Sequence, residues 1–129
     1  MDFTFIIYII TVMEDDTVGV ERELFTNDTL VERLNTLMQA GFCTQFAISG
    51  EVLRSASSNK LYEPSNIKSL KYYRFEGITD ASENSVLFVL ETTSGERGTA
   101  VERNGNSPDT RMIRFFKKVQ EFLNSNLVN

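Results

Sequence analysis

Apolar residues recur at helical spacing in two segments of the chain, one near residue 35 and one near residue 115. In the first segment the apolar positions are Leu30, Val31, Leu34, Leu37 and Met38. In the second they are Met112, Phe115, Phe116, Val119, Phe122 and Leu123. Offsets of three and four place each set on one helical face. The pattern predicts amphipathic helices from Asp28 to Ala40, ended by Gly41, and from Asp109 onward.

Between these helices the apolar pattern shortens to the period of β-strands. Residues 42–48 and a return starting at Val52 read as two short strands, and residues 70–77, 85–93 and 98–103 as three longer ones. A two-residue turn at Gly95 and Glu96 would pair Leu90 with Val101 and place Phe88 on the same face. Residues 55–68, rich in serine and containing Pro64, are expected to be mostly loop or edge.

The first residues of the chain allow two interpretations. Residues 3–12 are almost entirely β-branched or aromatic, which favours a strand buried on both sides. Met13 could equally be the true start, which would make residues 1–12 dispensable. We therefore predict an N-terminal extension over 1–26 with a possible extra strand, a single α+β domain over 27–125, and a frayed C-terminus over 126–129.

Two amphipathic helices flanking a run of strands must bury their apolar stripes against a sheet. The sequence predicts an α+β two-layer sandwich. Its sheet would be mostly antiparallel, with four to five strands, and both helices would lie on one face of it.

The net charge and the cysteine content limit the classes of binding partner and the cellular compartment that we expect. Thirteen basic and 18 acidic residues give a net charge of -5 over 129 residues, so phosphate backbones and anionic lipids would repel the chain. We expect no nucleic-acid or membrane partner, and the ten-residue apolar run is too short for a spanning helix. The single cysteine, Cys43, favours a reducing cytoplasm.

Residues that could carry catalysis are sparse. The chain has no histidine, which removes the commonest general base and transition-metal ligand. It also lacks a phosphate-binding glycine motif. Glu76, Glu91 and Glu102 lie on neighbouring predicted strands and could share a metal or an acid–base role, but solvated strand charges are the stronger interpretation. Cys43 is expected to be a small packed hydrophobe. No catalytic residue, metal or cofactor is predicted.

A binding surface is the better-supported hypothesis. The strand over 70–77 carries aromatic residues beside an arginine, the residue types enriched at binding hot spots. Strand alternation allows Tyr72, Arg74 and Glu76 to point outward while Tyr73 and Phe75 face the helices. We predict that this outward set contacts a protein partner or a second copy of the chain.

Three pieces of sequence resemble a small uncharacterised bacterial domain family, some of whose members carry the label phosphoribosylpyrophosphate synthetase. They are the opening helix with Gly41 and Phe42, the block 73–77, and residues 84–87 with the following Gly95 and Gly98. The label implies pyrophosphate transfer from ATP to ribose 5-phosphate. Synthetases of that name are longer two-domain proteins, and only residues 86–95 echo their ribose-phosphate loop. The resemblance therefore leaves a small phosphoribosyl- or nucleotide-related enzyme or ligand-binding protein as the alternative to a non-enzymatic binding domain.

Overall fold

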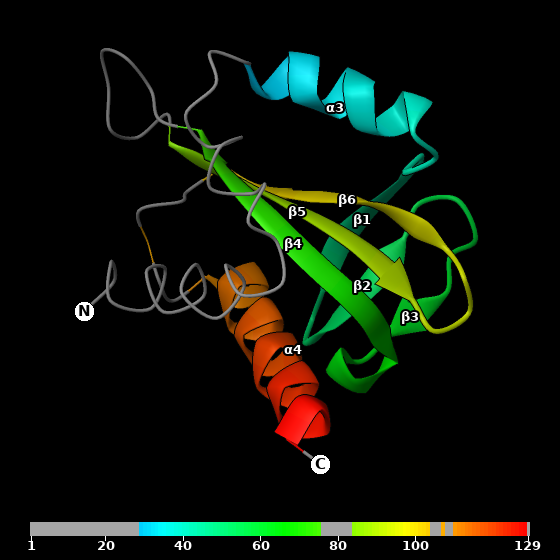
Figure 1. Ribbon diagram of the computed structural model, residues 1–129, viewed down its shortest axis with the longest axis vertical. Helices are drawn as coiled ribbons and strands as arrows, with labels where there is room; N and C mark the ends of the chain where they lie inside the picture. Colours follow the sequence, from blue (N-terminus) through cyan, green and yellow to red (C-terminus); the bar gives the residue numbers. More distant parts are fainter. Residues whose placement is uncertain (1–28, 76–83, 104–106, 108–109, 129) are drawn as a thin grey trace.

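The computed structural model describes residues 29–75, 84–103, 107 and 110–128 (Figure 1). The predicted strand over 3–12, the residues Asp28, Glu76 and Asp109, and the extension as a whole lie outside the described residues. The elements in chain order are α3 (Leu30–Gln39), β1 (Thr44–Ser49), β2 (Val52–Ser55), β3 (Leu61–Tyr62), the 3-10 helix η1 (Pro64–Asn66), β4 (Ile67–Phe75), β5 (Ser85–Thr92), β6 (Arg97–Glu102) and α4 (Arg111–Val128). The α4 helix thus includes residues 126–128.

The described strands form one sheet in the order β3-β2-β1-β6-β5-β4. All neighbouring strands are antiparallel except β1 and β6, which run parallel and pair only at Thr44 with Gly98 and at Gln45 with Thr99. The α+β class is confirmed. The sheet is six-stranded and mixed, whereas the sequence predicted four to five mostly antiparallel strands. The difference arises because residues 61–62 form an edge strand and because β6 returns beside β1.

The two helices lie on opposite faces of the sheet, so the prediction that both cover one face is wrong (Figure 1). The cause is β5, whose side chains are buried along both faces. Phe88 and Leu90 belong to the core on the α4 side, and Leu87 and Val89 belong to a separate cluster on the α3 side. A strand that is apolar on both faces needs a cover on each, which gives three layers.

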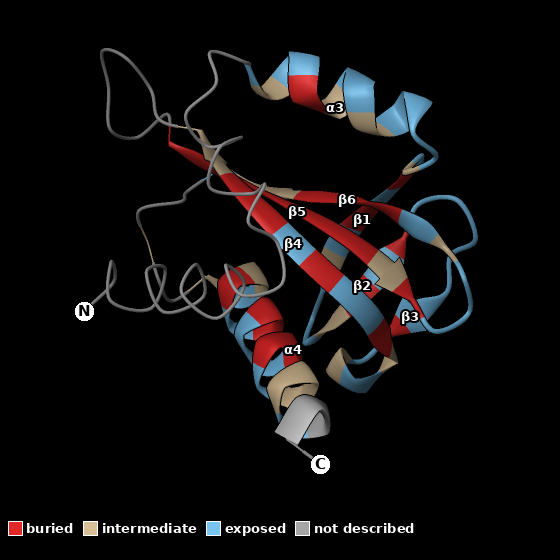
Figure 2. Ribbon diagram, in the orientation of Figure 1, coloured by how far each residue is buried: buried red, intermediate tan, exposed pale blue. Residues whose placement is uncertain are grey.

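The α4 side holds the larger core. From the helix, Ile113, Phe115, Phe116 and Val119 are buried against residues of β1, β2, β4 and β5 (Figure 2). The ring of Phe116 stacks on that of Phe88 with 4.1 Å between the ring centroids. The predicted stripe is confirmed at Phe115, Phe116 and Val119.

The α3 helix, predicted from Asp28 to Ala40, runs from Leu30 to Gln39 with Thr29 as its N-cap. Thr29 accepts a hydrogen bond from the Glu32 amide at 3.1 Å, and the Glu32 carboxylate accepts one from the Thr29 amide at 2.9 Å, which is a capping box. Gly41, at φ +102°, follows the helix in the left-handed conformation. The apolar side chains of α3 that face the sheet, Leu30, Leu34 and Leu37, are only half-buried.

The β5–β6 hairpin has a different register from the predicted one. Leu90 pairs with Gly98 and Leu87 pairs with Val101, so Val101 lies on the α3 side, opposite the face of Leu90. The turn contains three residues, 93–95, and Gly95 takes φ +95° at its last position. This three-residue turn lies earlier in the chain than the predicted two-residue turn at Gly95 and Glu96. The strands that flank it therefore pair in a different register.

Gly98 brings β6 close to β1. A Cβ atom at this position would lie 1.8 Å from the Thr44 carbonyl oxygen, so only glycine fits. This close approach joins the β3-β2-β1 part of the sheet to the β6-β5-β4 part.

In the described part of the chain, no helix combines the length and the apolar character needed to cross a membrane.

Candidate functional site

An extended polar cluster surrounds the carboxylate of Glu96, beside the β5–β6 turn. Its Oε1 atom accepts hydrogen bonds from the hydroxyls of Tyr62 at 2.6 Å and Ser58 at 3.0 Å. Its Oε2 atom accepts from Thr44 at 3.3 Å and from Ser55. We call these five residues the Glu96 cluster. They come from β1, β2, the β2–β3 turn and β3, so one carboxylate connects the β3-β2-β1 strands to the β5–β6 hairpin.

The turn itself holds Glu96 in place. The Thr92 hydroxyl accepts from the Glu96 amide at 3.0 Å and lies 3.0 Å from the Ser94 hydroxyl. The Ser94 hydroxyl lies 2.9 Å from that of Tyr62. The Ser55 hydroxyl also accepts from the amides of Ser57 and Ser58, at 3.1 and 3.0 Å. The residues that echoed a ribose-phosphate loop therefore form an antiparallel turn whose hydroxyls bind within the protein.

The electrostatics of Glu96 favour the ionised form. Partial burial alone would raise the pKa of this carboxyl, but the hydrogen bonds from Ser55, Tyr62, Ser58 and Thr44 together hold it below its ordinary value. A carboxylate that accepts hydrogen bonds from four hydroxyl groups is a poor general base, because its lone pairs are already engaged. The Glu96 cluster is therefore suited to hold the sheet together.

Sequence reasoning missed the Glu96 cluster. It placed Thr44 in a strand, residues 55–68 mostly in a loop or edge, and Glu96 in a turn. Glu96 is separated in sequence by 41 residues from Ser55 and by 52 from Thr44. Local periodicity carries no information about contacts at such separations. The available signal was the concentration of serines over 55–58, which suggested only a loop.

The structure separates the residues of the predicted contact surface. Tyr72 is 1% exposed and lies in the core on the α4 side, so the prediction that it points outward is wrong. The error arises because α4 covers this face of the sheet, which the sequence predicted to be uncovered. Arg74 is half-buried, and Glu76 lies outside the described residues, so their roles in binding stay predictions. Tyr73 is buried on the α3 side, with the Arg33 guanidinium 5.0 Å from its ring centroid.

The other candidate residues do not form a site. Glu91 and Glu102 lie at opposite ends of the β5–β6 ladder, where they pair with Arg97 and Val86. Glu91 also lies 3.9 Å from the Lys68 ammonium. Cys43 is exposed rather than packed, and its thiol donates to the Met38 carbonyl at 3.4 Å. Among the residues described, no group of three or more histidine, cysteine or acidic side chains could hold a metal ion.

Part of the sheet on the α3 side is open. Strand pairing places Ala47 opposite Arg54, and Arg54 opposite Leu61, on the face away from the α4 core. These three side chains and that of Gln45 are exposed, and Leu61 is 60% exposed. We call Gln45, Ala47, Arg54 and Leu61 the open sheet face. The uncovered surface that the sequence suggested is thus present, but on β1 to β3 rather than around residue 74.

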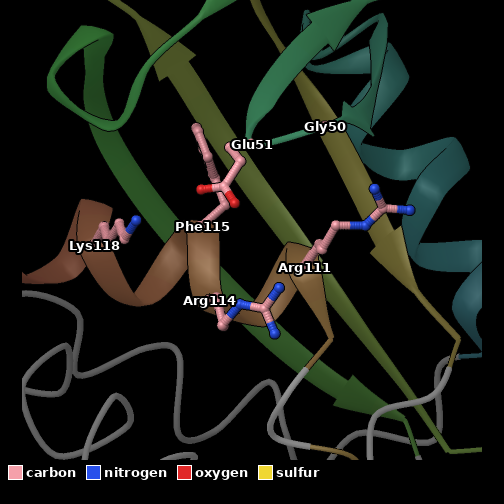
Figure 3. A pocket seen from close by; sticks show the side chains of 6 residues that line it. All are labelled: Gly50, Glu51, Arg111, Arg114, Phe115 and Lys118. Atoms are coloured by element: carbon pink, nitrogen blue, oxygen red, sulfur yellow. The ribbon is translucent and has the colours of Figure 1, made fainter.

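A second surface feature is a shallow hollow between α4 and the β1–β2 turn. Its space amounts to about 260 Å³ when the open solvent at its mouth is included, so very little of it is enclosed. We call it the cationic hollow, and it is lined by Gly50, Glu51, Arg111, Arg114, Phe115 and Lys118. Figure 3 shows Glu51 extending over Phe115, with Lys118 on one side and the two arginines on the other.

Comparison of the chain with models of protein families, with curated proteins and with solved structures gave no match in any of the three searches.

Proposed function

We propose that the protein is a non-enzymatic cytoplasmic domain that binds another protein chain through the open sheet face. The observation that carries the proposal is the unequal cover of the sheet. The α3 helix covers residues of β4 to β6, whereas Gln45, Ala47, Arg54 and Leu61 remain exposed on β1 to β3. An antiparallel sheet face that no helix covers meets either water or a partner.

The chemistry of the open sheet face supports a contact with protein. Leu61 and Ala47 flank Arg54 across the strands, so the arginine lies between two apolar residues. Arginine within an apolar surround is a frequent hot-spot arrangement, because the guanidinium stacks and donates several hydrogen bonds at once. Arg54 also donates to the Asn59 side chain at 3.0 Å, which limits its rotamers before binding.

The Glu96 cluster supports a non-enzymatic role. Its carboxylate and its hydroxyls bind one another, and Ser55 and Thr92 are fully buried. Because these groups are hydrogen-bonded to one another, we interpret them as holding the two parts of the sheet together rather than as binding a substrate.

Site-specific photo-crosslinking in cells tests the contact directly. A photoreactive residue at position 61 should yield an adduct of discrete mass, and the additional change Arg54→Glu should abolish it. The matched control places the same residue at Glu121, on the exposed side of α4. A second copy in the adduct would identify self-association, and a different chain a hetero-partner. The absence of an adduct at position 61, or the same adduct from position 121, would contradict the proposal.

A small phosphoribosyl- or nucleotide-related enzyme or ligand-binding protein is the alternative function. The cationic hollow favours it, because phosphate groups bind to clustered arginine and lysine side chains. A thermal-shift screen with ribose phosphates and nucleotides, with and without magnesium, tests this alternative independently of the open sheet face.

A further inference from the structure

The large apolar side chains that stay exposed lie on one side of the sheet. In the part of the chain whose burial the structure describes, they are Val31 and Met38 on α3 and Leu61 on β3. Leu61 belongs to the open sheet face, which lies on the same side of the sheet as α3. Apolar residues scattered singly over a surface need no partner, whereas a group on one side of a molecule points to a contact.

Val31 and Met38 lie on the flank of α3 that points away from β4. Each residue turns a helix by about 100°, so positions 31 and 38 lie together and position 33 lies on the opposite flank. The Arg33 guanidinium lies 5.0 Å from the ring centroid of Tyr73 on β4, so that opposite flank faces β4. Because β4 is the last strand at its edge of the described sheet, the apolar flank of α3 faces the side of β1 to β3.

The cover on this side of the sheet is complementary to itself. The half formed by β4 to β6 carries α3, whereas no described helix covers the open sheet face on β1 to β3 (Figure 1). Two copies can face each other on this side, related by a two-fold axis within the layer of the α3 helices. Each α3 then fills the space over the other copy's open sheet face. Such an interface is isologous and closes as a dimer, because both copies use the same two surfaces.

The charges of the two surfaces have opposite signs. Arg54 is the charged residue of the open sheet face. The α3 helix contains Glu32 and Arg33, and Arg33 is buried, so the exposed side of α3 presents a carboxylate. One oxygen of this carboxylate accepts a hydrogen bond from the Thr29 amide, and a carboxylate has sites for further donors. A guanidinium group is a strong donor to such a group.

We infer that the chain bound by the open sheet face is a second copy of this protein, whose α3 lies on it. The inference rests on the proposed function, because it names the partner of the same surface. The dimer buries Val31, Met38 and Leu61 of both copies. It is a weak dimer, because α3 has ten residues and is about 15 Å long, so the buried area lies at the small end of specific interfaces.

Sedimentation equilibrium of the full chain tests the association. We expect a monomer–dimer equilibrium with a Kd between about 1 µM and 1 mM. Val31→Ser and Leu61→Ser should each raise the Kd at least about tenfold, since each substitution acts twice in a symmetric dimer. Glu121→Gln, on the exposed side of α4, is the control and should leave the Kd unchanged. A chain that stays monomeric at about 1 mM, or equal effects of all three variants, would overturn the inference.

Isotope-filtered NMR of an equimolar mixture of labelled and unlabelled chains identifies the surfaces that meet. We expect contacts between the Leu61 methyl groups of one copy and α3 side chains of the other. A dimer whose intermolecular contacts come from other elements would contradict the inference.

Photo-crosslinking from position 61 separates this inference from the proposed function. An adduct with a second copy supports both. An adduct with a different chain alone overturns the inference and leaves the proposed function standing, and the absence of any adduct contradicts both.

Discussion

The two faces of the sheet are covered by helices of similar amphipathic pattern but very different packing. On the α4 side, four apolar helix residues are buried and Phe116 is completely inaccessible. On the α3 side, the apolar residues Leu30, Leu34 and Leu37 stay half-buried, and Val31 and Met38 are 65% and 50% exposed. Apolar spacing therefore predicts which face of a helix turns inward, but not how completely that face is buried.

The reason for the difference lies in the sheet. The α4 side presents Phe46, Leu53, Tyr72 and Phe88 from strands on both sides of the parallel junction. The α3 side presents the buried Tyr73, Leu87 and Val89 from β4 and β5, with the partly buried Val101 from β6. Burial of apolar area is the main stabilising term, so we expect the α4 side to dominate the free energy of unfolding. The following predictions test that ranking.

The largest expected loss follows from Phe116→Ala. Removing a fully buried ring that stacks on Phe88 should lower the free energy of unfolding by about 3–5 kcal/mol. Denaturant unfolding measures this loss, with Glu121→Ala on the exposed side of α4 as the control. A melting temperature close to that of the parent would contradict the packing of α4.

Glu96→Ala should rank second. The substitution leaves the hydroxyl of the fully buried Ser55 without its carboxylate partner and frees those of Tyr62, Ser58 and Thr44. Losing one partner of a buried hydrogen bond costs about 1–3 kcal/mol. The same unfolding assay measures the loss, and Glu102→Ala, which removes a strand carboxylate outside the Glu96 cluster, serves as the control. Equal stability of Glu96→Ala and the parent would show that the cluster contributes nothing.

The pH dependence of stability should report the same cluster. The pKa of Glu96 is lowered in the folded state, so its contribution is complete above the unfolded pKa and is lost as pH falls through the folded value. From roughly pH 5 to pH 3 the parent should therefore lose more stability than Glu96→Gln does. Parallel pH profiles for the two proteins would contradict the assigned role of the carboxylate.

Leu34→Ala on α3 should cost less, below about 2 kcal/mol, because the side chain is only half-buried. Val31→Ser should have almost no effect, since Val31 faces solvent. Thermal unfolding of both variants beside Phe116→Ala gives the comparison under one set of conditions. A loss for Leu34→Ala as large as that for Phe116→Ala would reverse the ranking of the two faces.

Local signals predicted the elements well. The left-handed Gly41 ends α3 as expected, and the apolar stripe of α4 is buried at its centre. The N-cap of α3 is Thr29, one residue after the predicted start at Asp28. Alternation also located the three longer strands, which are β4, β5 and β6. Such features depend on residues within one or two turns of each other, and the sequence contains that information directly.

Features that depend on distant contacts were not predictable in the same way. The parallel pairing of β1 with β6, which requires Gly98, joins residues more than 50 positions apart. Whether Tyr72 is buried depends on which helix covers which face of the sheet. The sequence does not decide this, because both helices show the same amphipathic spacing. The hairpin register depended on the position and the length of the turn, which changed the partner of Leu90 from Val101 to Gly98 and placed Val101 on the other face. The Glu96 cluster joins the β5–β6 turn to four other segments, and the five segments have no common local pattern.

Native-state hydrogen exchange tests the unequal cover of the two faces most directly. We predict that amides at the centre of α4 and of β5 exchange only through global unfolding. Amides of α3 should exchange through a local opening with a clearly smaller free energy. Leu34→Ala should lower protection within α3 alone, and Phe116→Ala should lower it throughout the described chain. Equal free energies of exchange for α3 and α4 would contradict the account.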